Sequence, residues 1–97
     1  MKYGIIIEQP VYSEINAAVS YYDELQSGLG KDFFDNLSAS IEILKSNPFF
    51  QVRYKKYRFL PLKRFPFIIV FEIDQPKKVV IVWSVFHSSQ SPLKLPK

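Results

Sequence analysis

The chain has 97 residues, a net charge of +4, no cysteine, 47% apolar residues and 16% aromatic residues. This length supports one hydrophobic core, so we expect a single domain over residues 1–97, and the aromatic content excludes a disordered chain. The lack of cysteine excludes disulfides and thiolate metal sites. No run approaches the ~20 apolar residues of a membrane helix, and the first apolar run is too short for a signal peptide, so we expect a cytoplasmic protein.

Charge is unevenly distributed along the chain. Residues 1–47 hold three lysines against seven acidic residues, a net charge of −4. Residues 48–97 hold ten Lys or Arg against two acidic residues, a net charge of +8. The basic half favours an acidic or polyanionic partner.

The first half of the chain predicts a strand and two helices. Residues 3–7 form a β-branched run that Pro10 ends, and apolar residues recur at helical spacing from Ser13, a candidate N-cap, to Leu25. Glycines 28 and 30 allow a short link to a second helix, which Pro48 stops. One stripe of that helix is apolar and holds Phe33, Leu37, Ile41 and Leu44.

After Pro48 the apolar period changes to two, which predicts strands. The first strand, near residues 50–60, loses its phase at residues 55–56, and we interpret the break as a β-bulge. Residues 65–73 and 79–87 predict two more strands joined by the turn at residues 75–78, with Phe71 and Trp83 in the core. The expected fold is α+β, in the order β-α-α-β-β-β, with a helix hairpin on one face of a mainly antiparallel four-stranded sheet.

An apolar set is expected on the sheet face away from the helices. It consists of Ile68, Val70, Val80 and Val82. An exposed patch of this kind usually marks a partner surface. The alternative is that the C-terminal tail covers it through Leu93 and Leu95, or that a second copy does so in a homodimer.

Four motifs together resemble the RelE/ParE superfamily of bacterial type II toxins, and its ParE-like plasmid-stabilisation branch in particular. They are "YYDELQSGLGKDFFDNL", "NPFF", "LKRFPFIIVFEI" and "VVIVWSVFHSSQSPLKL". The resemblance implies a toxin neutralised by a cognate antitoxin, a segment of which would cover the apolar face. ParE-like members are thought to poison DNA gyrase, whereas RelE-like members cut messenger RNA on the ribosome, and the shared fold cannot choose between these targets.

His87 is the candidate catalytic residue if the chain is a ribonuclease, because RNA cleavage needs a proton acceptor, a proton donor and cations near the phosphate. The alternative is a histidine that only makes a hydrogen bond at a strand end. The resemblance places Ile68 and Ser88 where RelE-like enzymes carry arginines. These departures favour a gyrase inhibitor that acts by binding, and they also allow a degenerate member that binds an antitoxin without being toxic.

Six cations are candidate contacts to a target or to nucleic acid, against the alternative of a solvated strand face. They are Arg53, Lys55, Lys56, Arg58, Lys63 and Arg64. The sequence has no phosphate-binding glycine loop and no His, Asp and Glu cluster at metal-ligand spacing. We therefore expect neither a metal nor another cofactor.

Overall fold

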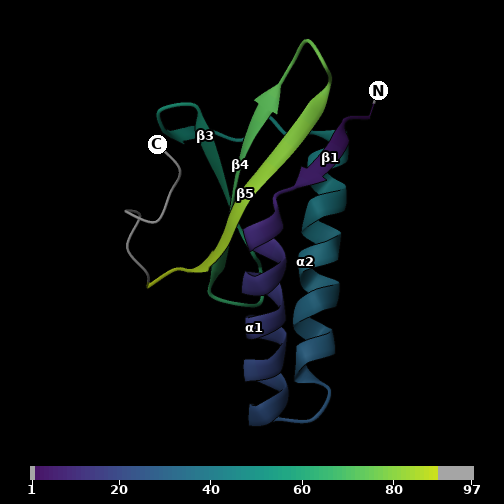
Figure 1. The fold of residues 1–97 in the computed structure, drawn as a ribbon, viewed down its shortest axis with the longest axis vertical. Coiled ribbons are helices and arrows are strands. Elements are labelled where there is room, and N and C mark those ends of the chain that lie inside the picture. Colours follow the sequence, from purple (N-terminus) through teal and green to yellow (C-terminus); the bar gives the residue numbers. More distant parts are fainter. Residues whose placement is uncertain (1, 90–97) are drawn as a thin grey trace.

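The computed structural model describes residues 2–89, which form two helices and one five-stranded sheet (Figure 1). The elements are β1 (Gly4–Ile7), α1 (Gln9–Leu25), α2 (Leu29–Ser46), β2 (Val52–Tyr54), β3 (Tyr57–Pro61), β4 (Phe67–Asp74) and β5 (Val79–His87). The strand order is β1-β5-β4-β3-β2, with β1 parallel to β5 and all other pairs antiparallel. The expected α+β fold and element order are confirmed, but the sheet has five strands rather than four.

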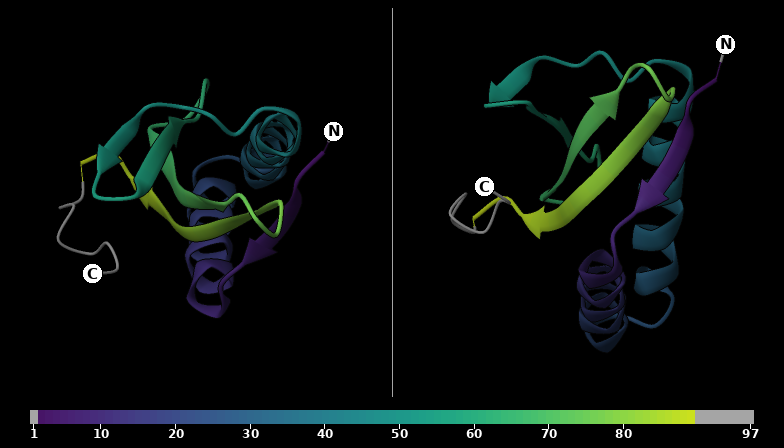
Figure 2. Two further views of the ribbon diagram at one scale, coloured as in Figure 1. Left: turned by 90° about the horizontal axis from the view of Figure 1, so that it is seen from above. Right: turned by 45° about the horizontal axis from the view of Figure 1, so that its top comes forward.

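The two helices form an antiparallel hairpin that lies to one side of the sheet (Figures 1 and 2). Helix α1 begins at Gln9 rather than after Ser13, because Pro10 fits the first turn, where its missing N–H has no intrahelical partner to lose. Gly28 takes the left-handed conformation at φ 89° between the helices. The Asp23 carboxylate accepts a hydrogen bond of 2.8 Å from the Gly30 N–H, which links the end of α1 to the start of α2.

The extra strand arises at the expected phase break. A turn at Lys55 and Lys56 divides that region into β2 and β3, and Lys55 adopts φ 53° there. The register of the β2–β3 pair also shifts between Val52 and Tyr54. An irregularity of the β-bulge type, as expected from the sequence, therefore lies in β2 next to the turn.

The main core lies between the helix hairpin and the sheet. Its buried members include Val11, Ile15, Phe33, Leu37 and Leu44 from the helices, and Ile69, Phe71, Val80, Val82 and Val85 from the sheet. Phe71 is thus in the core, as predicted. Leu93 and Leu95, which were the alternative cover for the other face, lie outside the described residues.

The predicted placement of Val80 and Val82 on the face away from the helices is wrong. Both side chains are fully buried in the main core. Val82 pairs with Phe71 and Val80 with Ile73, and residues directly opposite on antiparallel strands share a face of the sheet. Because Phe71 faces the helices, Val80 and Val82 must face them too.

The opposite face holds a second, smaller cluster. Its buried members are Tyr57, Val70 and Phe86, and Phe59, Ile68 and Trp83 pack against them. Ile68 and Val70 therefore lie on the expected face, but Val70 has no exposed surface with which to contact a partner.

Trp83 belongs to this second cluster rather than to the main core. The register shifts where Val70 pairs with Ser84 and Phe71 with Val82, so Trp83 is the extra residue of a β-bulge. Its indole N–H donates a 2.7 Å hydrogen bond to Glu72, whose carboxylate also lies 3.6 Å from the Lys56 ammonium. Polar groups thus border this face.

Candidate functional site: a groove between helix and sheet

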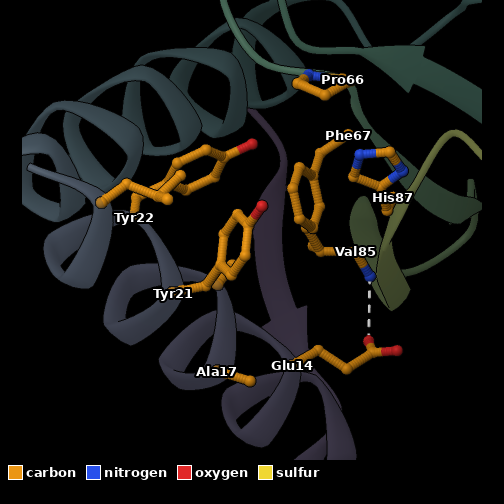
Figure 3. A pocket seen from close by; sticks show the side chains of 10 residues that line it. Glu14, Ala17, Tyr21, Tyr22, Pro66, Phe67, Val85 and His87 are labelled. Carbon is orange, nitrogen blue, oxygen red and sulfur yellow. Dashed lines mark hydrogen bonds between the residues drawn. The ribbon is translucent and has the colours of Figure 1, made fainter.

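A groove of about 560 Å³ lies between α1 and the end of the sheet where β4 begins and β5 ends. We call it the α1 groove, and Figure 3 shows the α1 side chains facing those of β4 and β5 across it. Its lining consists of Glu14, Ala17, Ala18, Tyr21, Tyr22, Leu25, Pro66, Phe67, Val85 and His87. Among the described residues, no Lys or Arg belongs to this lining. The α1 groove is therefore mainly apolar and aromatic, with one carboxylate.

The Glu14 carboxylate fastens α1 to β5. It accepts hydrogen bonds from the Val85 N–H at 3.0 Å and from the Ser84 hydroxyl at 3.2 Å. Strand β1 pairs with β5 only as far as Val82. Beyond that residue α1, rather than a strand, lies next to the edge of β5 and supplies a hydrogen-bond acceptor through Glu14. Glu14 thus satisfies a backbone donor that would otherwise lie at an open sheet edge.

Two adjacent tyrosines on α1 have different roles in the α1 groove. Tyr22 is buried, with its ring stacked on Phe33 at a centroid distance of 5.5 Å. Burial raises the pKa of the Tyr22 hydroxyl, and the neighbouring Tyr21 adds to the rise. Tyr21 is 58% exposed and Leu25, one turn further along α1, is 61% exposed. Tyr22 therefore belongs to the fold, while Tyr21 and Leu25 form a rim that a partner can contact.

His87 lies on the wall of the α1 groove opposite the tyrosines (Figure 3). Its ring packs edge-on against Phe67 at a centroid distance of 5.3 Å. The Ser89 N–H lies 3.1 Å from Nδ1, and the Ser89 hydroxyl lies 2.8 Å from the same atom. Because a backbone N–H can only donate, Nδ1 is the acceptor in this geometry, and the hydrogen of a neutral ring is on Nε2. The structure thus places His87 in a groove, and its catalytic role stays a prediction.

The six predicted contact cations do not form one patch. Arg53, Lys55 and Lys56 lie on β2 or the turn after it. Lys63 and Arg64 lie in the loop after β3, at the opposite end of that strand. This second group is at the same end of the sheet as the α1 groove, because Pro66 in that loop accepts a 2.7 Å hydrogen bond from the Ser88 N–H.

Arg58 has a structural role in the fold. Its guanidinium donates a 2.7 Å hydrogen bond to the Phe50 carbonyl and lies 5.6 Å from the centre of the Phe49 ring. These contacts hold the segment before β2 against β3. Contact of the six cations with a target, Arg58 included, stays a prediction.

Sequence reasoning missed the contribution of α1 to this site. Glu14, Ala17, Tyr21 and Leu25 are spaced three or four residues apart, which places them along one side of a helix. The sequence alone shows that these residues share one side of the helix, but only the tertiary structure shows that this side of α1 lies next to His87. Glu14 had no signal of its own, because a single carboxylate near a helix start is common.

The sequence model of a protein family, described as the ParE toxin of the type II toxin-antitoxin system parDE, matches residues 5–92 of the chain. The chain belongs to the ParE toxin family. Among solved structures it is similar to a chain of the chromosomal ParDE toxin-antitoxin system from P. aeruginosa, with a TM-score of 0.76, 14% identity, and coverage of 89% of this chain and 96% of that one.

Two RelE structures also share the fold. The chain is similar to a doubly substituted E. coli RelE toxin in the free state, with a TM-score of 0.59, 17% identity, and coverage of 92% of this chain and 86% of that one. It is similar to a chain of the archaeal RelE-RelB complex from Pyrococcus horikoshii, with a TM-score of 0.57, 12% identity, and coverage of 94% and 100% respectively. No curated protein sequence matches the chain.

The described residues contain neither a membrane-spanning helix nor a cluster of metal-ligating side chains. Within residues 2–89, neither helix is both long and apolar enough to cross a bilayer. Over the same residues, no three His, Asp or Glu side chains come together as metal ligands.

Proposed function

We propose that this ParE-type toxin stops growth by binding DNA gyrase in the cytoplasm, and that a cognate antitoxin neutralises it. The observation that carries the proposal is the match to the ParE family over residues 5–92. The chemistry of the α1 groove supports inhibition by binding over RNA cleavage. Cleavage needs cations around the phosphate as charge develops, but the described lining residues around His87 include a carboxylate and no Lys or Arg.

The proposal is tested with purified protein in a supercoiling assay with gyrase and relaxed plasmid. We expect inhibition and accumulation of cleaved plasmid, and in cells we expect growth arrest with a DNA damage response and intact messenger RNA. Growth arrest with fragmented messenger RNA and unaffected supercoiling would contradict it. Unimpaired growth with folded protein would instead support the degenerate, non-toxic alternative.

The second candidate function is that of a ribosome-dependent endoribonuclease without a metal. The position of His87 on the wall of a groove favours it, and RelE toxins share the fold. Replacing His87 by Ala separates the two functions. A ribonuclease loses about two to four orders of magnitude in cleavage rate without its general acid or base, whereas a gyrase inhibitor retains most of its potency. His87→Gln is the matched control, because it keeps a polar side chain while removing the titratable ring.

Neutralisation is supported by the relatives, since the similar P. aeruginosa and Pyrococcus horikoshii chains come from toxin-antitoxin assemblies. The test is co-expression with the small protein encoded beside the toxin gene. We expect restored growth and a stable complex on size-exclusion chromatography. Restored growth without complex formation would refute neutralisation by direct binding.

A further inference from the structure

One end of the molecule is basic, and it lies away from the α1 groove. The turns between β2 and β3 and between β4 and β5 lie at this end together with the end of α2, whereas the link between the helices lies at the other end of the long axis (Figure 1). We call it the basic end, and it is defined by six cations: Lys45, Lys55, Lys56, Arg58, Lys77 and Lys78. The carboxylates beside them, Glu42, Glu72 and Asp74, each accept a hydrogen bond within the protein. Positive charge is therefore in excess there, which favours a polyanionic partner.

Two aromatic rings form a row with two of these cations at the basic end. The Lys78 ammonium lies 5.8 Å from the centre of the Tyr3 ring, and the Tyr3 ring centre lies 6.0 Å from that of Phe49. The Arg58 guanidinium lies 5.6 Å from the centre of the Phe49 ring on the other side of the pair. The order along the row is therefore cation, ring, ring, cation. Phe49 is 50% exposed, so a large part of its ring is open to solvent.

Hydrogen bonds to the backbone hold the row in place, although its four side chains come from four separate segments. The Tyr3 N–H donates to the Lys45 carbonyl at 2.8 Å, and the Gly4 N–H donates to the Lys78 carbonyl at 2.9 Å. These bonds join the start of β1 to the end of α2 and to the β4–β5 turn. Arg58 is fixed by its hydrogen bond to the Phe50 carbonyl, which uses one of the five N–H donors of a guanidinium. A ligand that binds such a preorganised row pays little to order it.

Lysine occupies a left-handed backbone position at each of the two turns of the basic end. Lys55 has a φ of 53° and Lys78 a φ of 56°, and they are the only residues other than glycine with a positive φ in the described part of the chain. Glycine and asparagine adopt this conformation at a lower cost than lysine does. The backbone of these turns therefore disfavours lysine, and a requirement for a cationic side chain gives a reason for its presence.

We propose that the basic end binds single-stranded DNA, with phosphates at Lys78 and Arg58 and an unpaired base stacked on Phe49. Proteins that bind single strands combine cations along the phosphate backbone with aromatic rings on which the bases stack. In a duplex the bases already stack on one another, so an exposed ring favours an unpaired strand. The choice of DNA over RNA rests on the proposed function, because gyrase acts on DNA. The basic end would then contact the DNA that gyrase holds.

Two matched pairs of substitutions test the row. Lys78→Asn removes the charge with a residue that suits the left-handed backbone. Its control is Lys31→Gln, which removes an exposed charge near the start of α2, at the other end of the molecule. Phe49→Leu removes the ring and stays apolar, and its control is Phe34→Leu, because Phe34 on α2 is also 50% exposed. Circular dichroism and thermal unfolding verify that the four variants fold.

Binding is measured by fluorescence anisotropy with a labelled DNA of about 12 nucleotides, a length within the range that single-strand binding folds cover. The same sequence is also supplied as a duplex and as single-stranded RNA. We expect the DNA single strand to bind at least about tenfold more tightly than the duplex. Lys78→Asn and Phe49→Leu should each weaken single-strand binding by about three- to tenfold, while both controls stay within about twofold of the wild type.

The salt dependence of binding separates the roles of the cation and the ring. For single strands, the logarithm of the binding constant falls with the logarithm of the salt concentration, with a slope of about −0.7 for each phosphate neutralised. Lys78→Asn should therefore make the slope shallower by about 0.7, whereas Phe49→Leu should weaken binding and leave the slope unchanged. An equal change of slope in Lys31→Gln would show that only the overall charge matters, and it would overturn the inference.

The inference is also overturned if the single-stranded DNA does not bind at about 0.05 M salt, or if the duplex or the RNA binds more tightly than it does. The supercoiling assay with gyrase separates this inference from the proposed function. Inhibition of gyrase by a wild type that does not bind single-stranded DNA would leave the gyrase proposal intact and overturn the inference. Binding of single-stranded DNA through Lys78 and Phe49 without inhibition of gyrase would support the inference, and the proposed function would fail.

Discussion

Replacing Glu14 by Ala should destabilise the protein through the two donors that the carboxylate now satisfies. The Val85 N–H and the Ser84 hydroxyl both bond to it, and these residues are only 2% and 5% exposed. A buried donor left without an acceptor costs about 1–3 kcal/mol. Water from the open groove can satisfy part of this demand, so we expect a total loss of about 2–4 kcal/mol. With a urea m-value of about 1.5–2 kcal/mol/M, the unfolding midpoint should fall by about 1–2.7 M.

Trp83 is the only tryptophan in the chain and precedes Ser84, so its fluorescence reports unfolding close to the change. Glu14→Gln is the matched control, because its carbonyl oxygen can still accept from the Val85 N–H, and we expect about half the loss. In the Glu14→Ala, Ser84→Ala double variant the orphaned hydroxyl is gone, so the losses should fall short of additivity by about 1 kcal/mol. A Glu14→Ala midpoint within about 0.3 M of the wild type would refute the assignment of Glu14 as the link between α1 and β5.

Three further predictions concern packing and ionisation. Gly30→Ala should destabilise the protein by about 1–2 kcal/mol in thermal unfolding, because the new Cβ would lie 2.5 Å from the Val19 carbonyl oxygen. This steric clash outweighs the higher helix propensity of alanine, and an unchanged or higher Tm would contradict the prediction. Val82→Ala should cost about 2 kcal/mol in urea unfolding and Val52→Ala less than about 0.5 kcal/mol, since Val82 is fully buried and Val52 is 42% exposed. Similar losses for the two variants would contradict the placement of Val82 in the core beneath the helices. Because the pKa of Tyr22 is raised in the folded state, the folded protein keeps the hydroxyl proton to a higher pH than the unfolded chain does. The stability that Tyr22 contributes in this way is complete below its ordinary pKa of 10.0 and is lost as the pH rises through the higher folded pKa. Tyr22→Phe should therefore make the fall in Tm above pH 10 shallower, and parallel pH profiles of the two proteins would refute this.

The order of elements was predictable because each depends on local chemistry. Apolar spacing marked both helices, and Pro48 marked the end of the second, which stops at Ser46. The fifth strand was not recognised, since strand β2 has only three residues and the turn at Lys55 uses a left-handed conformation that lysine seldom adopts. Neither feature carries the glycine or asparagine signal that normally marks a hairpin turn.

The pairing of β5 with β4 determines which β5 side chains face the helices. The local sequence pattern does not specify this pairing. Strand β5 is apolar on both faces, so alternation alone gives two equivalent answers. The pairing of Val82 with Phe71 selects one of them, and the bulge at Trp83 then changes the phase for the last residues of the strand. The same bulge explains how His87, five residues after Val82, lies on the helix side, where strict alternation would have placed it on the other face.

This change of phase determines what chemistry His87 can take part in. Without the bulge its ring would point to the face that carries the Lys56–Glu72 ion pair, whereas with it the ring lies against Phe67 in the α1 groove. A phosphate entering the α1 groove would meet the Glu14 carboxylate and the negative end of α1, and it would find no Lys or Arg among the described lining residues. The register of one strand thus determines which side chains surround the only histidine in the chain.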